Sequence, residues 1–277
     1  NSKDSNIFDK WILYKLDSVV ADFKKYTTNY RFDLMANSIY DFVWNEYCDW
    51  YLEIAKNNMN DSTKNNLIFS ITRIIKLCHP IIPFITEDIW SEFLNKGFVS
   101  EKMLINSSFP SQIRISKEYD IDQRVTCIKN IIKKIRKTRT ELGIAPKKMI
   151  HVQLIIKDNS LKNDITEYLG LISSMSNVDI NIIEQQNNKS EYIDLIDDDY
   201  TIYLKIRNMV NVNEEMTRID KKVSELMIII KKIEAKLNNK DFIERAPSSI
   251  INQNVANKTK IENDILSLKG LRDTLSD

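Results

Sequence analysis

The sequence predicts a mainly α-helical protein with a small α/β insert and a C-terminal antiparallel coiled-coil hairpin. Only four of its 277 residues are glycine, which disfavours turn-dense all-β folds and Gly-rich phosphate loops. Apolar residues recur every three or four positions through the first third of the chain, which is the period of a helix. From about residue 213 to the end they recur in heptads, which is typical of coiled coils.

Four amphipathic helices are expected between residues 9 and 94, and four such helices form a bundle. The second, from about 31 to 56, is apolar on most sides and should be buried. The third ends before Pro80, because proline disfavours helix at the preceding residue, and the fourth follows Pro83. Large aromatic side chains dominate protein cores, so the four tryptophans are expected inside the bundle: Trp11, Trp44, Trp50 and Trp90.

A further helix is expected from about 122 to 142, ended by Gly143 and Pro146. Residues 149–156, 178–183 and 200–206 are rich in strand-forming residues, and a short helix near 161–173 lies between the first two runs. Asp197, Asp198 and Asp199 are expected in a turn. These elements form the α/β insert.

Two heptad seams follow, from Met216 to Leu237 and from Ile251 to Leu275, on either side of a short break. Asn254, Lys258 and Arg272 interrupt the second seam. Each seam covers roughly 25 residues, so the folded-back hairpin should project about 40 Å at a rise of about 1.5 Å per residue.

Composition and motifs exclude several classes of site. The net charge is +1, so a nucleic-acid surface would have to be local. Three widely spaced cysteines have neither zinc-ligand nor disulfide spacing, which fits a reducing, cytoplasmic setting. No apolar run approaches the length of a membrane span. Neither histidine has a nucleophile or base nearby in sequence, and His79 is expected to satisfy carbonyls at a helix end. We therefore assign no catalytic residue, metal ligand or cofactor to this segment.

The helix from 122 to 142 carries the main basic cluster of the sequence. No acidic residue lies between Lys129 and Thr140, and two lysines follow after the turn. Such a cluster suits RNA phosphates, and the alternative is an ordinary solvated lysine face. The candidate RNA-contacting residues are Lys129, Lys133, Arg136, Lys137, Arg139, Lys147 and Lys148.

The second helix carries a polar stripe at every fourth position: Asn37, Asp41, Asn45, Asp49 and Glu53. Amides and carboxylates can pair with exocyclic amines of bases, although a solvated stripe or a network inside the bundle is the favoured interpretation. Arg31 and Phe32 combine a cation with a stacking ring, as recognition of unpaired RNA bases requires, and the alternative is a core aromatic residue at a helix start. Candidates for base contacts are Arg31, Phe32, Asn45 and Asp49.

Four strings in the chain, in this order, resemble the valyl-tRNA synthetase family: WNEYCDWYLE (Trp44 to Glu53), LCHPIIPFITEDIW (Leu77 to Trp90), IRKTRTELGIAPKK (Ile135 to Lys148) and KLNNKDFIERAP (Lys236 to Pro247). The second also occurs in related class I synthetases, whereas the fourth, inside a heptad hairpin, is the valine-specific one. The resemblance implies a helical anticodon-binding domain at residues 1–149, a connecting α/β segment at 150–212 and a coiled-coil tRNA-binding arm at 213–277.

The resemblance further implies a role in attaching valine to tRNA-Val, with ATP and Mg²⁺ used by the parent enzyme. The family's His-Ile-Gly-His and Lys-Met-Ser-Lys-Ser nucleotide motifs do not occur in this sequence. A catalytic domain N-terminal to Asn1 is therefore expected as the partner of this segment, which we expect to be monomeric and inactive alone. The basic cluster and the resemblance together favour RNA over a solvated lysine face.

Two alternatives compete with this hypothesis. The chain could be the C-terminal part of an isoleucyl- or leucyl-tRNA synthetase, although the heptad hairpin and the lack of clustered zinc cysteines argue against that. It could also be a non-enzymatic helical scaffold whose coiled-coil arm binds proteins. Salt-dependent binding of tRNA would favour the synthetase interpretations over the scaffold.

Overall fold

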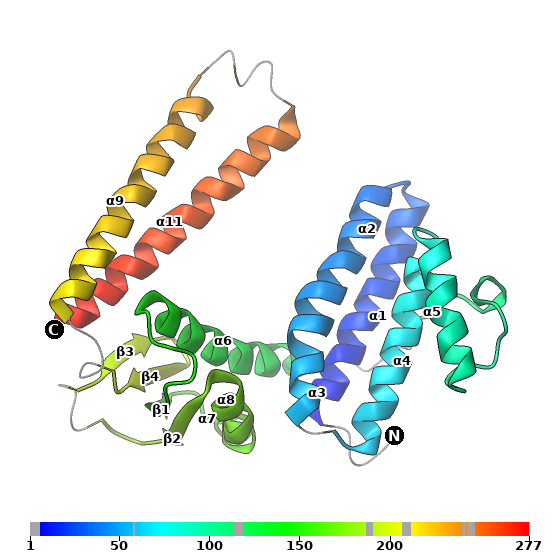
Figure 1. Cartoon of the computed structure of the whole chain (residues 1–277), viewed down its shortest axis with the longest axis horizontal. Coiled ribbons are helices and arrows are strands. Elements are labelled where there is room, and N and C mark those ends of the chain that lie inside the picture. Colours follow the sequence, from blue (N-terminus) through cyan, green and yellow to red (C-terminus); the bar gives the residue numbers. More distant parts are fainter. Residues whose placement is uncertain are drawn as a thin grey trace. The chain divides into compact units, whose positions relative to one another are not determined.

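The computed structural model of the chain describes residues 6–57, 59–113, 119–186, 191–206, 212–239, 242 and 247–276. The chain forms two compact units, residues 1–129 and 130–277, and each is described by itself (Figure 1). The boundary between them falls inside helix α6 (Tyr119–Glu141). The division into three parts at residues 149 and 212 stays a prediction.

The first unit is a helical bundle, as predicted. Its long helices are α1 (Ile7–Thr28), α4 (Asp61–Cys78) and α5 (Pro83–Asn95), and η2 (Leu104–Asn106) is a single 3₁₀ turn. The predicted second helix is one continuous rod, but its middle is not α-helical: α2 (Phe32–Asp41) continues into the π-helix η1 (Phe42–Leu52) and then α3 (Glu53–Asn57). Asn6 and Asn60 cap α1 and α4 by accepting backbone N–H hydrogen bonds, and Pro83 begins α5.

A buried carboxylate joins three helices at one end of this bundle. The Asp9 side chain at the start of α1 accepts hydrogen bonds from the Tyr51 hydroxyl at 2.7 Å and the Thr63 hydroxyl at 3.2 Å. Both partners are needed, because a buried charge without hydrogen bonds is costly. Tyr51 lies in the last turn of η1 and Thr63 in the first turn of α4, so the α1–α2 and α4–α5 turns both lie at the opposite end of the bundle (Figure 1).

The second unit contains a four-stranded sheet with the order β2-β1-β4-β3. Strands β1 (Ile150–Ile156) and β2 (Val178–Ile182) are parallel, joined by α7 (Asn159–Glu167) and α8 (Leu169–Ser176), so the predicted single short helix is two helices. Strand β4 (Tyr200–Leu204) pairs antiparallel with both β1 and β3 (Ile193–Ile196). The three predicted strands and the acidic turn before β4 are confirmed, whereas β3 was not predicted.

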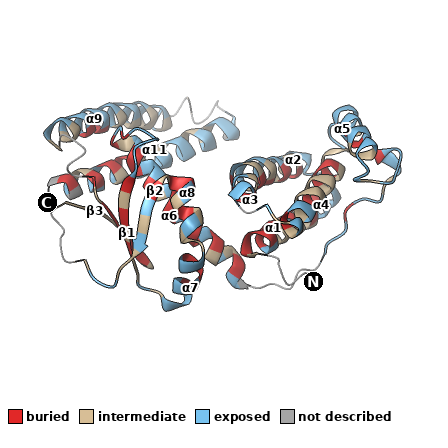
Figure 2. Cartoon of the chain, turned by 60° about the horizontal axis from the view of Figure 1, so that its bottom comes forward, coloured by how far each residue is buried: buried red, intermediate tan, exposed pale blue. Residues whose placement is uncertain are grey.

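The coiled-coil hairpin consists of α9 (Val212–Leu237) and α11 (Ser248–Ser276), which pack side by side (Figure 1). Two residues that interrupt the second seam reach across the pair: Lys258 binds Glu234 at 2.8 Å, and Arg272 binds Asp220 at 2.6 Å. The two ion pairs lie two heptads apart on both helices and run in opposite order, which confirms the antiparallel arrangement. Buried seam residues gather near the start of α9 and the end of α11 (Figure 2).

Among the described residues, no helix combines the length and apolar character that crossing a membrane requires.

Candidate nucleic-acid interface

Lys129 belongs to the core of the first unit rather than to a basic surface. Its side chain is 8% exposed, its ammonium nitrogen lies 4.7 Å from the centre of the Trp11 ring and 5.1 Å from that of Trp50, and it forms an ion pair with Glu46. Aromatic ring faces attract a cation, and the carboxylate balances its charge inside the protein. The prediction that Lys129 contacts RNA phosphates is therefore corrected.

Arg139 is also buried, with 5% of its surface exposed. Its two terminal nitrogens donate to five backbone carbonyls: those of Ser176 and Asn177 at the C-terminal end of α8, and those of Ala145, Pro146 and Lys148 in the turn after α6. Burial lowers the pKa of this guanidinium. Arg139 holds together two backbone segments, so its prediction as a tRNA contact is corrected too. The planar fork of arginine suits this multiple bonding.

The turn that Arg139 organises presents two predicted residues to solvent. Gly143 has a φ of +61°, which favours glycine, and ends α6 where the sequence predicts. Lys147 and Lys148 follow and are both exposed. The Lys148 carbonyl is 2.5 Å from Arg139, so the backbone that carries these two ammonium groups is fixed.

The remaining candidates on α6, which are Lys133, Arg136 and Lys137, are exposed, but they are not free of local partners. The Arg136 guanidinium donates twice to the Met175 carbonyl, at 2.9 and 2.6 Å. The Lys137 ammonium lies 3.8 Å from carboxylates of both Glu141 and Asp264. Lys134 is half-buried and paired with Asp197, whereas Lys133 is exposed. Five of the seven candidates are exposed, and we call these five the basic surface: Lys133, Arg136, Lys137, Lys147 and Lys148.

The predicted base contacts of the bundle divide into two groups. Arg31 donates to both carboxylate oxygens of Asp33, at 2.9 and 2.7 Å, so its fork already has an acidic partner. That hydrogen bonding lowers the pKa of Asp33 to about 2. Phe32 is exposed and meets Tyr30 edge to face at 6.4 Å between ring centres, which excludes the alternative of a core aromatic residue.

Asn45 and Asp49 are exposed, together with the rest of the polar stripe, so the stripe is a surface and not a network inside the bundle. A pair of rings that the sequence did not reveal lies beside it. Trp44 is 56% exposed, and its ring stacks on that of Tyr40 at 6.4 Å between centres and an interplanar angle of 7°. The prediction that Trp44 is a core residue is wrong. The other three tryptophans are buried as expected.

Both histidines have structural partners. The Nδ1 atom of His79, at the C-terminal end of α4, is 2.8 Å from the Thr86 hydroxyl, and that of His151 on β1 is 2.9 Å from Asp179. Within the described part of the chain, no three His, Cys, Asp or Glu side chains are placed to hold a metal ion. The exposed cations of the second unit and the exposed aromatic rings of the first are side chains of the kinds that contact nucleic acid.

Comparison with known proteins agrees with this arrangement. The family model described as the anticodon-binding domain of tRNA ligase matches residues 9–154, which is more than half of the chain. A second model, the valyl tRNA synthetase tRNA binding arm, matches residues 211–276, where the structure has α9 and α11.

The relatives include several bacterial valine–tRNA ligases. That of Francisella tularensis is 30% identical over 258 residues, which cover 88% of this chain and 27% of the relative. The enzyme of Legionella pneumophila strain Lens is 31% identical, and the match covers 88% of this chain and 28% of the relative. That of Buchnera aphidicola is 33% identical, and the match covers 89% of this chain and 27% of the relative. The chain thus spans little more than a quarter of the length of these relatives.

Proposed function

The chain belongs to the family of anticodon-binding domains of tRNA ligases, and on this premise we propose that it forms the tRNA-binding part of a valine–tRNA ligase. One observation carries the proposal. The anticodon-binding match and the valyl arm match occupy the two ends of a single chain, and the second falls on an antiparallel helix pair whose register is set by two ion pairs.

We further propose that the basic surface binds phosphates of the tRNA backbone. Its ammonium and guanidinium groups stay exposed, although Arg136 and Lys137 also have partners within the protein. Lysine and arginine bind nucleic acid by displacing counterions from phosphates, so this contribution falls as salt rises. Lys147 and Lys148 sit on a turn fixed by Arg139, which reduces the entropy lost when they bind.

For the bundle, we propose that Phe32, Asn45 and Asp49 contact unpaired bases. The phenyl ring offers a stacking face, and the amide and carboxylate match base edges. The stacked Tyr40 and Trp44 rings add a second aromatic surface next to Asn45. Arg31 is the weakest of these candidates, since a base would have to compete with Asp33 for its donors.

For the whole protein, we propose the activity that its relatives' names state, the ligation of valine to tRNA. The family resemblance implies that this activity uses ATP and Mg²⁺, and we propose both as its cofactors. The residues of this chain would supply binding energy and positioning of the tRNA relative to a nucleotide site elsewhere in the protein. None of its three cysteines forms a disulfide, which supports a cytoplasmic location. We propose that it acts as a monomer.

The test is fluorescence anisotropy with labelled tRNA-Val at about 50 and about 200 mM salt. We expect tight binding that weakens by orders of magnitude between the two salt concentrations, and weaker binding of tRNA-Ile. Equal affinity for both tRNAs would favour a class I synthetase of another specificity. Absence of tRNA binding by the folded chain would contradict the proposal and favour a protein-binding scaffold.

A further inference from the structure

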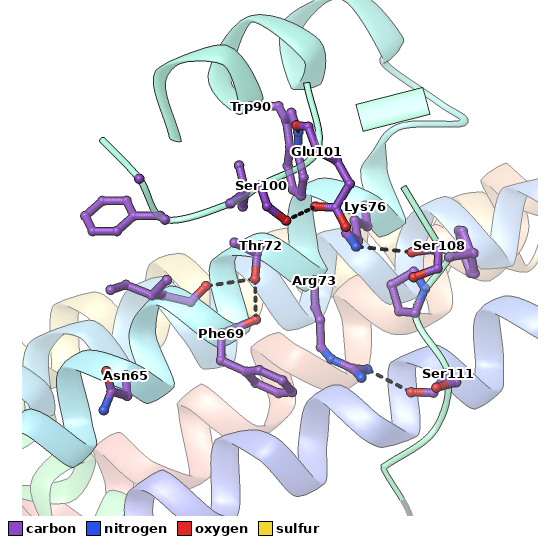
Figure 3. Close-up of a pocket in the computed structure, with 16 residues that line it drawn as sticks. Asn65, Phe69, Thr72, Arg73, Lys76, Trp90, Ser100, Glu101, Ser108 and Ser111 are labelled. Carbon is purple, nitrogen blue, oxygen red and sulfur yellow. Dashed lines mark hydrogen bonds between the residues drawn. The ribbon is translucent and has the colours of Figure 1, made fainter. Parts of the chain in front are cut away.

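The first unit contains an open pocket of about 620 Å³ beside α4. The segment from Gly97 to Ser111 forms one wall (Figure 3). Gly97, with a φ of +73°, ends α5 and turns the chain back toward α4. The Trp90 indole donates to the Glu101 carbonyl at 2.9 Å, and Arg73 donates to the Ser111 carbonyl at 2.8 Å. The wall is thus anchored at both ends, and the volume lies in the usual range of about 300–1,000 Å³ for ligand sites.

Aromatic rings line this pocket and remain accessible to solvent. Phe98 is 46% exposed, and Phe69 and Phe109 are exposed to a similar extent. The Phe98 ring is held edge to face against Phe93 at 5.6 Å between centres, and Phe109 is held against Phe23 at 4.8 Å. Exposure of these fixed ring faces to water is unfavourable, so a flat apolar partner that covers them gains free energy. Nucleobases are such partners.

Two cations lie on the α4 side of the same pocket. The Arg73 guanidinium carbon lies over the Phe69 ring, 4.8 Å from its centre, and the Lys76 ammonium, 3.2 Å from the Ser108 carbonyl, lies 5.4 Å from the centre of the Trp90 ring (Figure 3). An arginine plane extended over a phenyl ring is a further stacking surface for a base. In these positions both cations attract a phosphate electrostatically, without a direct contact.

The acid Glu101 also lines this pocket, and Asp17, which does not line it, acts electrostatically on Arg73. The Ser100 hydroxyl donates to the Glu101 carboxylate at 3.3 Å. The backbone N–H of Glu101 itself, and then the Ser100 hydroxyl and the nearby Lys76, lower the pKa of this carboxyl. An ionised carboxylate only accepts hydrogen bonds, so it pairs with exocyclic amines. Adenine, cytosine and guanine have such an amine, and uracil has none.

We infer that this pocket binds one unpaired nucleotide of an RNA strand, with the base against the Phe69 and Phe98 rings, an exocyclic amine at Glu101 and a phosphate near Arg73 and Lys76. The inference rests on the proposed function, because it takes RNA as the partner. It adds a base-binding site at residues that neither the basic surface nor the polar stripe includes, and it predicts which bases the site accepts.

The test uses the full chain with labelled single-stranded RNA of alternating A and C, and with oligo(U), at about 200 mM salt, where binding by phosphates alone is weak. We expect the A/C strand to bind at least about fivefold more tightly than oligo(U). Phe98→Leu keeps the apolar packing and removes the ring, so it should weaken A/C binding about tenfold. Glu101→Gln, whose amide also donates, should abolish the preference over oligo(U).

Matched controls are Phe84→Leu, which removes a ring that is 90% exposed outside the pocket, and Glu92→Gln, an exposed acid of α5 that does not line it. Neither should change binding. Free AMP and inorganic phosphate serve as competitors. Displacement of the strand by AMP at low concentration would show that the pocket takes free nucleotides and would overturn the RNA assignment, as would competition by phosphate alone.

The two proposals fail in different ways. Native-like A/C binding and base preference in folded Phe98→Leu and Glu101→Gln proteins would overturn the pocket inference, even if tRNA-Val still bound through the basic surface. Loss of tRNA-Val binding by the native chain would instead contradict the proposed function. In that case the same variants still decide whether the pocket binds a nucleotide, because the single-stranded RNA assay does not use tRNA.

Discussion

Replacing Arg139 by lysine would show whether the Arg139 side chain stabilises the second unit or contacts RNA. The arginine uses two nitrogens, with four N–H groups, to bond five carbonyls at 2.5 to 3.0 Å. A lysine keeps the charge but has three donors at one atom, so it leaves at least two of these five carbonyls without a charged partner. Hydrogen bonds to charged groups each contribute about 1.5–3 kcal/mol, and substitutions that leave several unmade are among the larger destabilising ones.

We therefore expect Arg139→Lys to destabilise the second unit by about 2–4 kcal/mol. For a unit of this size, about 2–4 °C of Tm is lost per kcal/mol, which gives a fall of about 4–16 °C. Scanning calorimetry measures this, because the two compact units can melt as separate transitions. The matched control is Lys133→Gln on the exposed side of α6, which should change stability by less than about 0.5 kcal/mol.

The same two proteins have opposite expected effects on RNA binding at a temperature where both are folded. Lys133→Gln should flatten the salt dependence of tRNA affinity, because it removes a surface cation, whereas Arg139→Lys should leave it unchanged. The reasoning is refuted if Arg139→Lys melts within about 1 °C of the native protein and nevertheless loses tRNA affinity. Such a result would return Arg139 to the RNA surface predicted from the sequence.

Four further outcomes are expected. Reversing Lys133, Arg136 and Lys137 to glutamate should weaken tRNA binding. The slope of log affinity against log salt concentration should fall by roughly 0.9 for each phosphate that is no longer neutralised, and by less on single strands. An unchanged slope would place the RNA surface elsewhere. Truncation after Asn213 should lower tRNA affinity and leave the melting of the bundle unchanged, although it removes Asp264 from Lys137 and so should lower the melting temperature of the second unit. Arg272→Asp should lower the free energy of unfolding of the hairpin by no more than about 1 kcal/mol, because its partner Asp220 is exposed. Adding Asp220→Arg should restore the ion pair and the lost stability, as measured in a double-mutant cycle. Asp33 should titrate at about 2, and Arg31→Gln should raise its pKa toward the ordinary value, as followed by carboxyl NMR shifts; an unshifted pKa would mean that Arg31 is available to RNA.

The helices and strands were largely predictable, because local periodicity reports which side of an element is buried. Ile128, Ile132 and Ile135 recur at helical spacing and are all buried on α6. The heptad seams of α9 and α11 are the less exposed stripes of both helices. Strand β3 escaped prediction because it has only four residues, Ile193–Ile196, with an aspartate in its middle. So short a run carries little of the alternation that marks a strand.

The basic face of α6 was predicted less well, because charge partners come from distant positions in the chain. No acid neighbours Lys129 in sequence, yet Glu46 lies 83 residues away and binds it in the core. Asp197 and Asp264 likewise pair with Lys134 and Lys137. Arg139 bonds neutral carbonyls, which no count of charged residues can detect. A run of lysines and arginines therefore indicates a basic surface only after its long-range partners are known.

The exposure of Trp44 follows from the π-helix that the sequence pattern did not reveal. Bonding from residue i to i+5 widens the turn, so residues five apart share a face. Phe42 and Tyr47 are both buried with ring centres 6.4 Å apart, and Tyr47 then meets Tyr51 at 5.8 Å. On a regular α-helix, residues three and four apart share a face, so Phe42 would instead bring Asn45 and Glu46 toward the core. The wider turn lets three aromatic residues fill the bundle and leaves Trp44, Asn45 and Asp49 on the surface, so the same segment has a packing face and a separate exposed face.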